Sequence, residues 1–76
     1  MEDLLVELAR RLVDEPDAVR VEQVEGDDVV VLRLFVAKDD VGQVIGRQGR
    51  IARALRQIVR AAGGRDRRRV LLEIVD

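Results

Sequence analysis

The spacing of the apolar residues alternates along this chain between the period of a helix and the period of a strand. Within residues 3–13, four apolar residues recur at i, i+3, i+4 and i+7: Leu5, Leu8, Ala9 and Leu12. This spacing predicts an amphipathic helix. Pro16 disfavours the helical conformation in the residue before it, so we expect the helix to end ahead of this proline.

Three later segments alternate with a period of two, which is typical of strands. The first begins at Val19 and continues to a turn at Gly26–Asp28, the second spans about 29–36, and the third lies near 70–75. In the second and third strands one face is entirely apolar: Val30, Leu32, Leu34, Val36, Val70, Leu72 and Ile74. Because the other face admits charged residues, we expect a sheet that is covered on one side only.

Two helical segments separate the second strand from the third. In the first, Val41, Val44 and Ile45 form an apolar stripe, and Asp40 with Gln43 three residues later has the spacing of a capping box. The second runs from about Arg50 to Ala62, with an apolar face of Ile51, Ala52, Leu55, Ile58, Val59 and Ala62. Gly63 and Gly64 then supply a glycine stop.

The resulting order is α-β-β-α-α-β. A hairpin joins the first two strands, and a right-handed crossover through the helical pair leaves the third strand parallel to its neighbour. The sequence therefore predicts a two-layer α/β (α+β) fold with a three-stranded mixed sheet and its helices on one face. At 76 residues it has room for one domain, spanning residues 1–76.

The residue types that are absent bear on function. The chain contains no Ser, Thr, Cys, His, Asn, Tyr or Trp. Common nucleophiles, imidazole acid–base groups, and thiolate or imidazole metal ligands are therefore missing, so we expect neither an enzyme nor a metal or other cofactor. A hydrolase based on carboxylates is the remaining enzymatic alternative. No signal peptide and no apolar run long enough to cross a membrane is present, so a cytoplasmic location is expected.

The charge is distributed unevenly although the net charge is −1. Residues 1–41 contain 5 basic and 12 acidic residues, whereas residues 42–76 contain 9 arginines and 3 acidic residues. A basic half of this kind indicates a polyanionic partner, and a solvated charged surface is the alternative explanation.

The two central helices are joined by the four residues Gly46–Gly49. The second helix begins after Gly49 with no carboxylate or hydroxyl side chain to cap it, so its leading N–H groups are available to an anion. Glycine lets a phosphate backbone come close, and Arg47 and Arg50 stand beside the opening. An ordinary tight turn between helices is the alternative.

Further arginines follow this loop. Arg53, Arg56 and Arg60 continue along the polar side of the second helix, where a solvated face explains them equally well. Four more precede the last strand: Arg65, Arg67, Arg68 and Arg69.

The run DVGQVIGRQGRIA (residues 40–52) resembles the signature of a KH domain, with its IGxxG loop between two helices. The order α-β-β-α-α-β resembles the type II, prokaryotic arrangement. The segments LVDEPD (residues 12–17) and RALR (residues 53–56) are similar to those of the small stand-alone bacterial KH proteins of the KhpA family.

This resemblance implies that the chain binds single-stranded RNA. In KH domains the loop holds about four nucleotides by their backbone, here through Gly46, Arg47, Gln48 and Gly49. Arg50 and Arg53 would add charge. An apolar groove for the bases would use Val44, Ile45 and Ile51 with the adjoining strand, although the same three residues are candidates for the core.

The resemblance also implies biological partners. Members of the family act as RNA chaperones or post-transcriptional regulators together with a larger KH-containing protein, called KhpB or Jag. That complex is associated with cell elongation and peptidoglycan homeostasis. A homodimer is a further possibility, which the competing hypothesis below addresses.

A competing hypothesis is a dimerisation or docking module. On the face of the sheet that admits charge, five apolar residues form a candidate partner surface: Val29, Val31, Phe35, Leu71 and Val75. Phe35 is the one aromatic residue, so binding through stacked bases, as in RRM or OB domains, is disfavoured, and Phe35 is expected to be packed or to face a partner.

Overall fold

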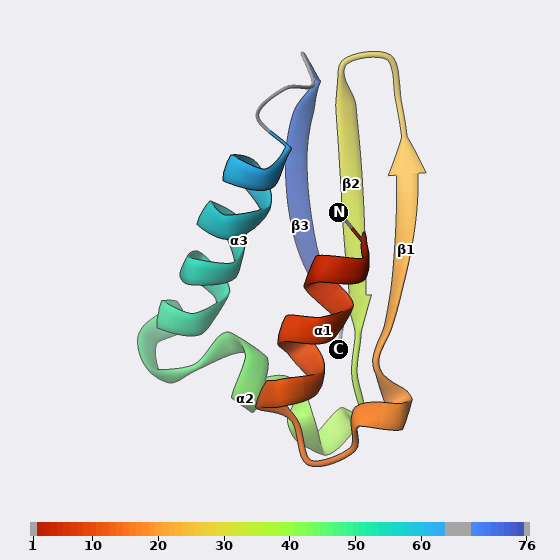
Figure 1. Ribbon diagram of the computed structural model, residues 1–76. Helices are drawn as coiled ribbons and strands as arrows, with labels where there is room; N and C mark the ends of the chain where they lie inside the picture. Colours follow the sequence, from red (N-terminus) through yellow and green to blue (C-terminus); the bar gives the residue numbers. More distant parts are fainter. Residues whose placement is uncertain (1, 64–67, 76) are drawn as a thin grey trace.

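A computed structural model of the protein describes residues 2–63 and 68–75 (Figure 1). Its elements are helix α1 (Glu2–Leu12), strands β1 (Arg20–Glu25) and β2 (Val29–Phe35), helices α2 (Val41–Ile45) and α3 (Arg50–Ala62), and strand β3 (Arg69–Val75). Short 3-10 turns at Pro16–Ala18, Lys38–Asp40 and Arg47–Gly49 connect them. The predicted order is confirmed, and α3 has the predicted bounds.

The three strands form one sheet in the order β1-β2-β3, with β2 in the centre. β1 pairs with β2 in antiparallel orientation, and β2 pairs with β3 in parallel orientation. The mixed sheet predicted from the crossover is therefore confirmed. Together with the order of the elements it matches the type II KH arrangement.

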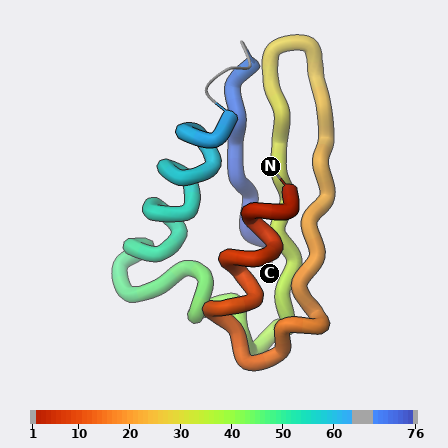
Figure 2. The backbone as a smooth tube through the Cα atoms, in the orientation of Figure 1, coloured from red at the N-terminus to blue at the C-terminus, as the bar shows by residue number. Residues whose placement is uncertain are grey.

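All three helices lie on one face of the sheet, so the molecule has two layers (Figures 1 and 2). α3 packs along β3 at one edge, α1 lies over β1, and α2 packs against α3 and β3. Between the layers is a core of buried apolar side chains: Leu5, Ala9, Val19, Val30, Leu32, Leu34, Val44, Ala52, Leu55, Val59, Val70 and Leu72. The apolar faces predicted for the strands β2 and β3 and for the helices α1 and α3 therefore pack against one another in this core.

The hairpin of β1 and β2 extends beyond the helices at its turn (Figure 1). β1 is exposed along its length apart from the half-buried Val21. Gln23 and Glu25 on this strand form a hydrogen bond of 2.8 Å between their side chains. Val21 is therefore the one residue of β1 that packs against the helical layer, together with Val19 just before the strand.

The start of α2 differs from the prediction. Asp40 makes no capping hydrogen bond, because the preceding 3-10 turn leaves it in a helical conformation (φ −98°, ψ −5°) instead of the extended one that a capping residue adopts. Its buried Oδ2 accepts a hydrogen bond from the Glu15 N–H at 3.0 Å, and the Gln43 side chain donates one to Asp14 at 3.2 Å. The predicted capping box is therefore wrong: both residues tie α2 to the loop after α1.

Among the described residues, no helix is both long enough and apolar enough to traverse a lipid bilayer.

Candidate nucleic-acid interface

The loop Gly46–Gly49, here called the GxxG loop, has an unusual backbone. Three of its four residues have positive φ angles: 76° at Gly46, 58° at Gln48 and 74° at Gly49. Gln48 is the only described residue other than glycine in this conformation, which side chains rarely adopt. In the view of Figure 1 this loop lies at the lower left edge of the molecule, between α2 and the start of α3.

The two glycines have different structural roles. A Cβ atom at Gly46 would lie 2.7 Å from Cγ1 of Ile51, so this glycine is needed both for its conformation and for space. A Cβ atom at Gly49 would meet nothing within 4 Å. The backbone at Gly49 therefore lies next to open space, where a ligand can approach.

The first turn of α3 has no side-chain cap, as predicted. Gly49 precedes the helix without a capping side chain, and no acidic residue lies in the first turn. The loop itself uses two of the leading donors, since the Gly49 N–H donates to Gly46 O at 3.2 Å and the Arg50 N–H donates to Arg47 O. Helix geometry leaves the N–H groups of Ile51 and Ala52 without an intrahelical acceptor. Of the four N–H groups at the start of α3, two thus remain available to an anion, which the positive end of the helix dipole also attracts.

Three arginines surround this turn. Arg47 and Arg50 are exposed and have no ion-pair partner within the described residues. Arg53 is also exposed, but its guanidinium donates a hydrogen bond of 3.0 Å to the carbonyl oxygen of Gln48. Sequence reasoning placed Arg53 among the RNA-contacting residues; the structure has it bonded to the loop backbone, at the residue with the strained φ angle.

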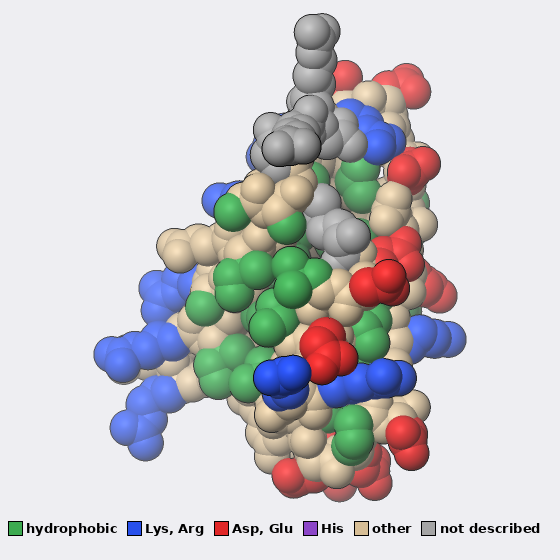
Figure 3. Space-filling view, viewed as in Figure 1, with side chains coloured by type: hydrophobic (Ala, Val, Ile, Leu, Met, Phe, Trp, Pro, Cys, Tyr) green, Lys and Arg blue, Asp and Glu red, His purple; other side chains and the backbone are tan. Residues whose placement is uncertain are grey.

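Charge is also segregated in space. In Figure 3, Lys and Arg side chains gather mainly along the left edge of the molecule, over α3 and the loop before it, while Asp and Glu side chains lie mainly on the right edge and at the lower end. Arg60 is exposed and Arg56 is half-buried on α3.

Of the four arginines near the start of the last strand, the structure describes Arg68 and Arg69. Arg68 pairs with Glu25 at 3.5 Å, and Arg69 is already part of β3. Arg65 and Arg67 lie outside the described residues, as does Gly64 of the predicted glycine stop.

The apolar residues near the loop divide into core and surface. Val44 is completely buried, so it belongs to the core and offers no surface to a base, contrary to its inclusion in a base-binding groove. Ile45 is 38% exposed, and Ile51 is half-buried against Gly46. The apolar pattern of Val41, Val44 and Ile45 did not show which of these residues would be buried. Their burial depends on how α3 and β3 pack against this five-residue helix.

Within the described part of the chain, no group of three or more Asp and Glu residues is arranged to hold a metal ion. The groups described near the loop are backbone N–H groups, guanidinium groups and the side chains of Ile45 and Ile51.

Comparisons with known proteins identify the family of the chain. The family model for "KhpA/KhpB, KH domain" matches residues 2–74. The RNA-binding protein KhpA of Bacillus subtilis (strain 168) is 49% identical over 76 residues, which are 100% of this chain and 94% of that protein. The RNA-binding protein KhpA of Clostridium acetobutylicum is 47% identical over 75 residues, covering 99% of this chain and 100% of that protein.

Among solved structures, the fold is similar to part of the crystal structure of Era in complex with MgGDPNP and nucleotides 1506–1542 of 16S ribosomal RNA. The TM-score is 0.54 with 25% sequence identity, over 96% of this chain and 28% of that longer one. The family match covers almost the whole chain, and the relatives align with it from end to end. The chain therefore belongs to the KhpA/KhpB family of KH domains.

Proposed function

We propose that this protein binds single-stranded RNA through the GxxG loop and the first turn of α3. The observation that carries the proposal is the uncapped start of α3 beside open space at Gly49, with the unpaired Arg47 and Arg50 next to it within the described residues. The relatives named RNA-binding protein KhpA support the same ligand.

Recognition would occur mainly at the RNA backbone. A phosphate that approaches at Gly49 meets the N–H groups of Ile51 and Ala52, and the guanidinium groups of Arg47 and Arg50 pair with its oxygens. The side chains of Ile45 and Ile51 offer apolar contact to the bases. Contacts to phosphate contain no sequence information, so we expect little sequence preference.

The double variant Arg47→Asp/Gln48→Asp tests this site. Both glycines are retained, and aspartate tolerates the positive φ of position 48, so the loop can still form. We expect affinity for a single-stranded RNA oligonucleotide, measured by fluorescence polarisation, to fall at least about tenfold, because two acidic groups would face the phosphates.

The matched control is Arg10→Asp/Gln57→Asp, which makes the same two kinds of substitution at exposed positions away from the loop. It should bind RNA nearly as well as the unchanged protein. Unchanged affinity in a folded Arg47→Asp/Gln48→Asp variant would contradict the proposed site.

The proposed biological role is that of an RNA chaperone or post-transcriptional regulator in the cytoplasm. Resemblance to the KhpA family supports a larger partner of the KhpB or Jag type, and the family model covers the KH domains of both proteins. Through that partner the protein would contribute to cell elongation and peptidoglycan homeostasis. Crosslinking in cells followed by RNA sequencing identifies the bound RNAs, and recovery of no RNA above background would count against the role.

A second candidate function is dimerisation or docking to another protein. It is favoured by the open face of the sheet, where Val24 is 51% exposed and Leu71 is 38% exposed. Light scattering over a range of concentrations measures self-association, and it can be performed on variants that no longer bind RNA. A concentration-independent monomer argues against the self-associating form of this function.

A further inference from the structure

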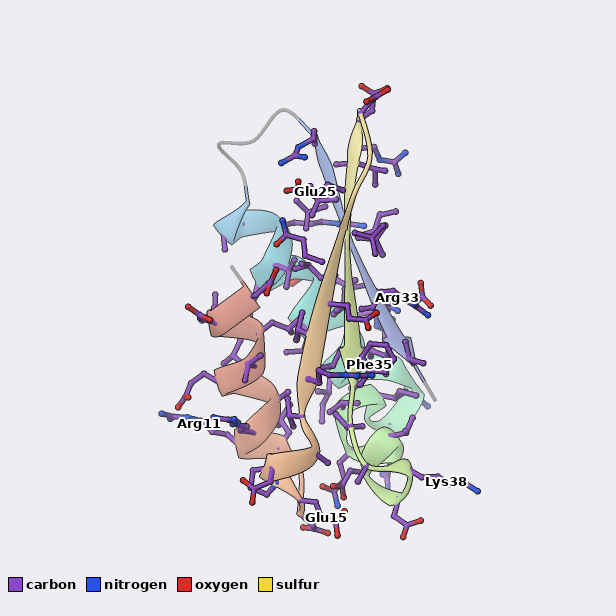
Figure 4. The ribbon with its side chains drawn as sticks, turned by 90° about the vertical axis from the view of Figure 1, so that its right-hand side faces the viewer. Arg11, Glu15, Glu25, Arg33, Phe35 and Lys38 are labelled. Carbon is purple, nitrogen blue, oxygen red and sulfur yellow. The ribbon has the colours of Figure 1, made fainter. Side chains whose placement is uncertain are left out.

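Strand β1 forms one edge of the sheet, and its outer side pairs with no other strand in the described part of the chain. The sheet has the order β1-β2-β3, so β1 is bonded to β2 alone. Figure 4 looks onto this edge, where β1 lies in front of β2 and no described helix or strand lies in front of β1. An edge strand presents N–H and C=O groups to which another extended chain can bind as an additional strand.

The register of the hairpin identifies the backbone groups that point outward. The Gly26 N–H donates to Val29 O at 2.7 Å, so these two residues form a hydrogen-bonded pair. Because hydrogen-bonded and non-hydrogen-bonded pairs alternate in an antiparallel ladder, Val24, Glu22 and Arg20 also bond to β2. The residues between them direct their N–H and C=O groups away from the sheet: Val21, Gln23 and Glu25.

The features that commonly protect edge strands are missing from β1. Natural edges are protected by lysine, proline, a β-bulge or charged side chains that obstruct pairing. β1 contains neither lysine nor proline, and its one-to-one register with β2 shows no bulge. Its six residues therefore form a regular strand that is open to pairing along its length.

The three charged side chains of β1 do not extend over the edge, because each contacts a group nearer the centre of the sheet. The contacts are Glu22 with Arg33 at 3.7 Å, Glu25 with Arg68 at 3.5 Å, and the Arg20 guanidinium carbon with the centre of the Phe35 ring at 4.3 Å. The outward backbone groups of β1 therefore stay accessible.

The surroundings of this edge are acidic. Residues 14–28, from the loop before β1 to the hairpin turn, contain seven Asp and Glu residues and a single basic residue, Arg20. In Figure 3, Asp and Glu side chains lie mainly on the right, where Figure 1 shows β1, and Lys and Arg side chains lie mainly over α3 on the left. The edge therefore repels a polyanion such as RNA and attracts a basic chain.

We propose that β1 binds an extended, basic peptide segment of another protein, which adds to the sheet as a fourth strand. The peptide backbone bonds to the outward groups of Val21, Gln23 and Glu25. Its lysine or arginine side chains lie near exposed carboxylates at the two ends of the strand, Asp17 before it and Asp27 after it. The inference rests on the docking function considered above, to which it gives a site and a class of partner, and it is independent of the GxxG loop.

The size of the edge predicts weak binding. At about 3.3 Å per residue, a strand of this length offers only about 20 Å for pairing. Apolar contact is limited to the half-buried Val21 on the helical side and to Val24, which is 51% exposed, on the other face. Because such a contact is smaller than a standard protein interface, we expect a dissociation constant on the order of 0.1 mM at low salt.

Fluorescence polarisation with a labelled peptide of about ten residues that alternates lysine and valine tests the proposal on the full chain. In one control peptide proline replaces the central valines, which keeps the charge but removes donors needed for pairing. In a second control peptide glutamate replaces every lysine. Both should bind at least about tenfold more weakly. Equal affinity for the proline peptide would exclude strand addition, and equal affinity for the glutamate peptide would exclude a basic partner.

The variant Gln23→Pro blocks the edge from the side of the protein. Because the Gln23 N–H points outward, proline removes no bond to β2 and places its ring where the peptide would pair. It should weaken binding of the lysine–valine peptide at least about tenfold. Gln23→Thr is the matched control, since it also loses the side-chain hydrogen bond to Glu25 but keeps the N–H, and it should bind within about threefold of the unchanged protein. Circular dichroism melts establish that both variants are folded.

Amide hydrogen exchange of the unchanged protein locates the peptide without any substitution, so it decides the question even if Gln23→Pro does not fold. The peptide at about 1 mM should slow exchange at Val21, Gln23 and Glu25. Exchange at Glu22 and Val24, which are already bonded to β2, should change little. No binding up to about 1 mM, or slowed exchange only outside β1, would overturn the inference. Slow exchange at the three outward amides without peptide, increasing with protein concentration, would show that a second copy occupies the edge and would also overturn it.

RNA binding separates this inference from the proposed RNA site. Gln23→Pro should bind single-stranded RNA as well as the unchanged protein does, and Arg47→Asp/Gln48→Asp should still bind the lysine–valine peptide. Loss of peptide binding in the loop variant would contradict a separate site on β1.

Discussion

At the scale of single residues, the two glycines of the GxxG loop differ in how much a side chain at their position would destabilise the fold. Gly46 combines a φ of 76° with a lack of room for a Cβ atom, whereas Gly49 has a φ of 74° in open surroundings. Gly46→Ala should therefore lower the free energy of unfolding by about 3 kcal/mol, of which the conformation accounts for about 1 to 2 kcal/mol and the overlap with Ile51 for the rest. Gly49→Ala should cost about 1 kcal/mol. Urea unfolding followed by circular dichroism measures both, and equal losses would contradict the assigned roles.

We assign Arg53 the role of holding the backbone of the GxxG loop in position. Arg53→Leu keeps helix propensity but removes the hydrogen bond to Gln48 O, which at an exposed position is worth about 0.5 to 1.5 kcal/mol. We expect faster amide hydrogen exchange at Gly49 and Arg50 and a modest loss of RNA affinity. Arg60→Leu on the same helix is the control, because Arg60 is exposed and lies 11 positions after Gly49, the last residue of the loop. Identical exchange rates in both variants would show that Arg53 does not hold the loop.

At the scale of elements, α2 has only five residues and depends on its attachments. Asp40 is 2% exposed and accepts the Glu15 N–H in a part-buried hydrogen bond, so Asp40→Ala leaves this backbone donor without its acceptor and should cost about 1 to 3 kcal/mol. Asp40→Asn keeps an acceptor oxygen and should cost less. The neighbouring exposed Asp39→Ala should change stability by no more than about 0.5 kcal/mol. Thermal or chemical unfolding measures all three, and a neutral Asp40→Ala would refute the attachment.

At the scale of the whole molecule, the separation of acidic and basic sides determines how RNA binding responds to salt. For a single strand, the slope of log K against log salt concentration changes by about 0.7 for each phosphate neutralised. Arg47→Gln should therefore make the slope shallower by about 0.7, whereas Arg10→Gln on α1 should leave it unchanged. Polarisation titrations between about 50 and 200 mM salt measure the slope. The same slope in the Arg47 variant would exclude a phosphate contact at this residue.

Much of the fold could be predicted because the relevant signals are local. Hydrophobic period identifies a helix or strand from residues within a few positions of one another, which is why α3 and the faces of β2 were predicted correctly. The positive φ angles at Gly46 and Gly49 also follow a local signal, since a short connection between two helices needs residues that tolerate this conformation. The missing cap of α3 could also be predicted, because the residues just before the helix have no carboxylate or hydroxyl side chain.

The sequence by itself thus determined the order of the elements, the side of each strand that faces the core, and the position of a basic, uncapped helix start. Only the tertiary structure decided that Val44 is buried while Ile45 is exposed, and that Asp40 binds a backbone N–H 25 positions away. It also aligned Glu22, Arg33 and Glu73 from three strands into one row. The physical reason is that burial, hydrogen-bond partners and ion pairs depend on which distant segments pack together, whereas periodicity and backbone conformation depend on neighbours along the chain.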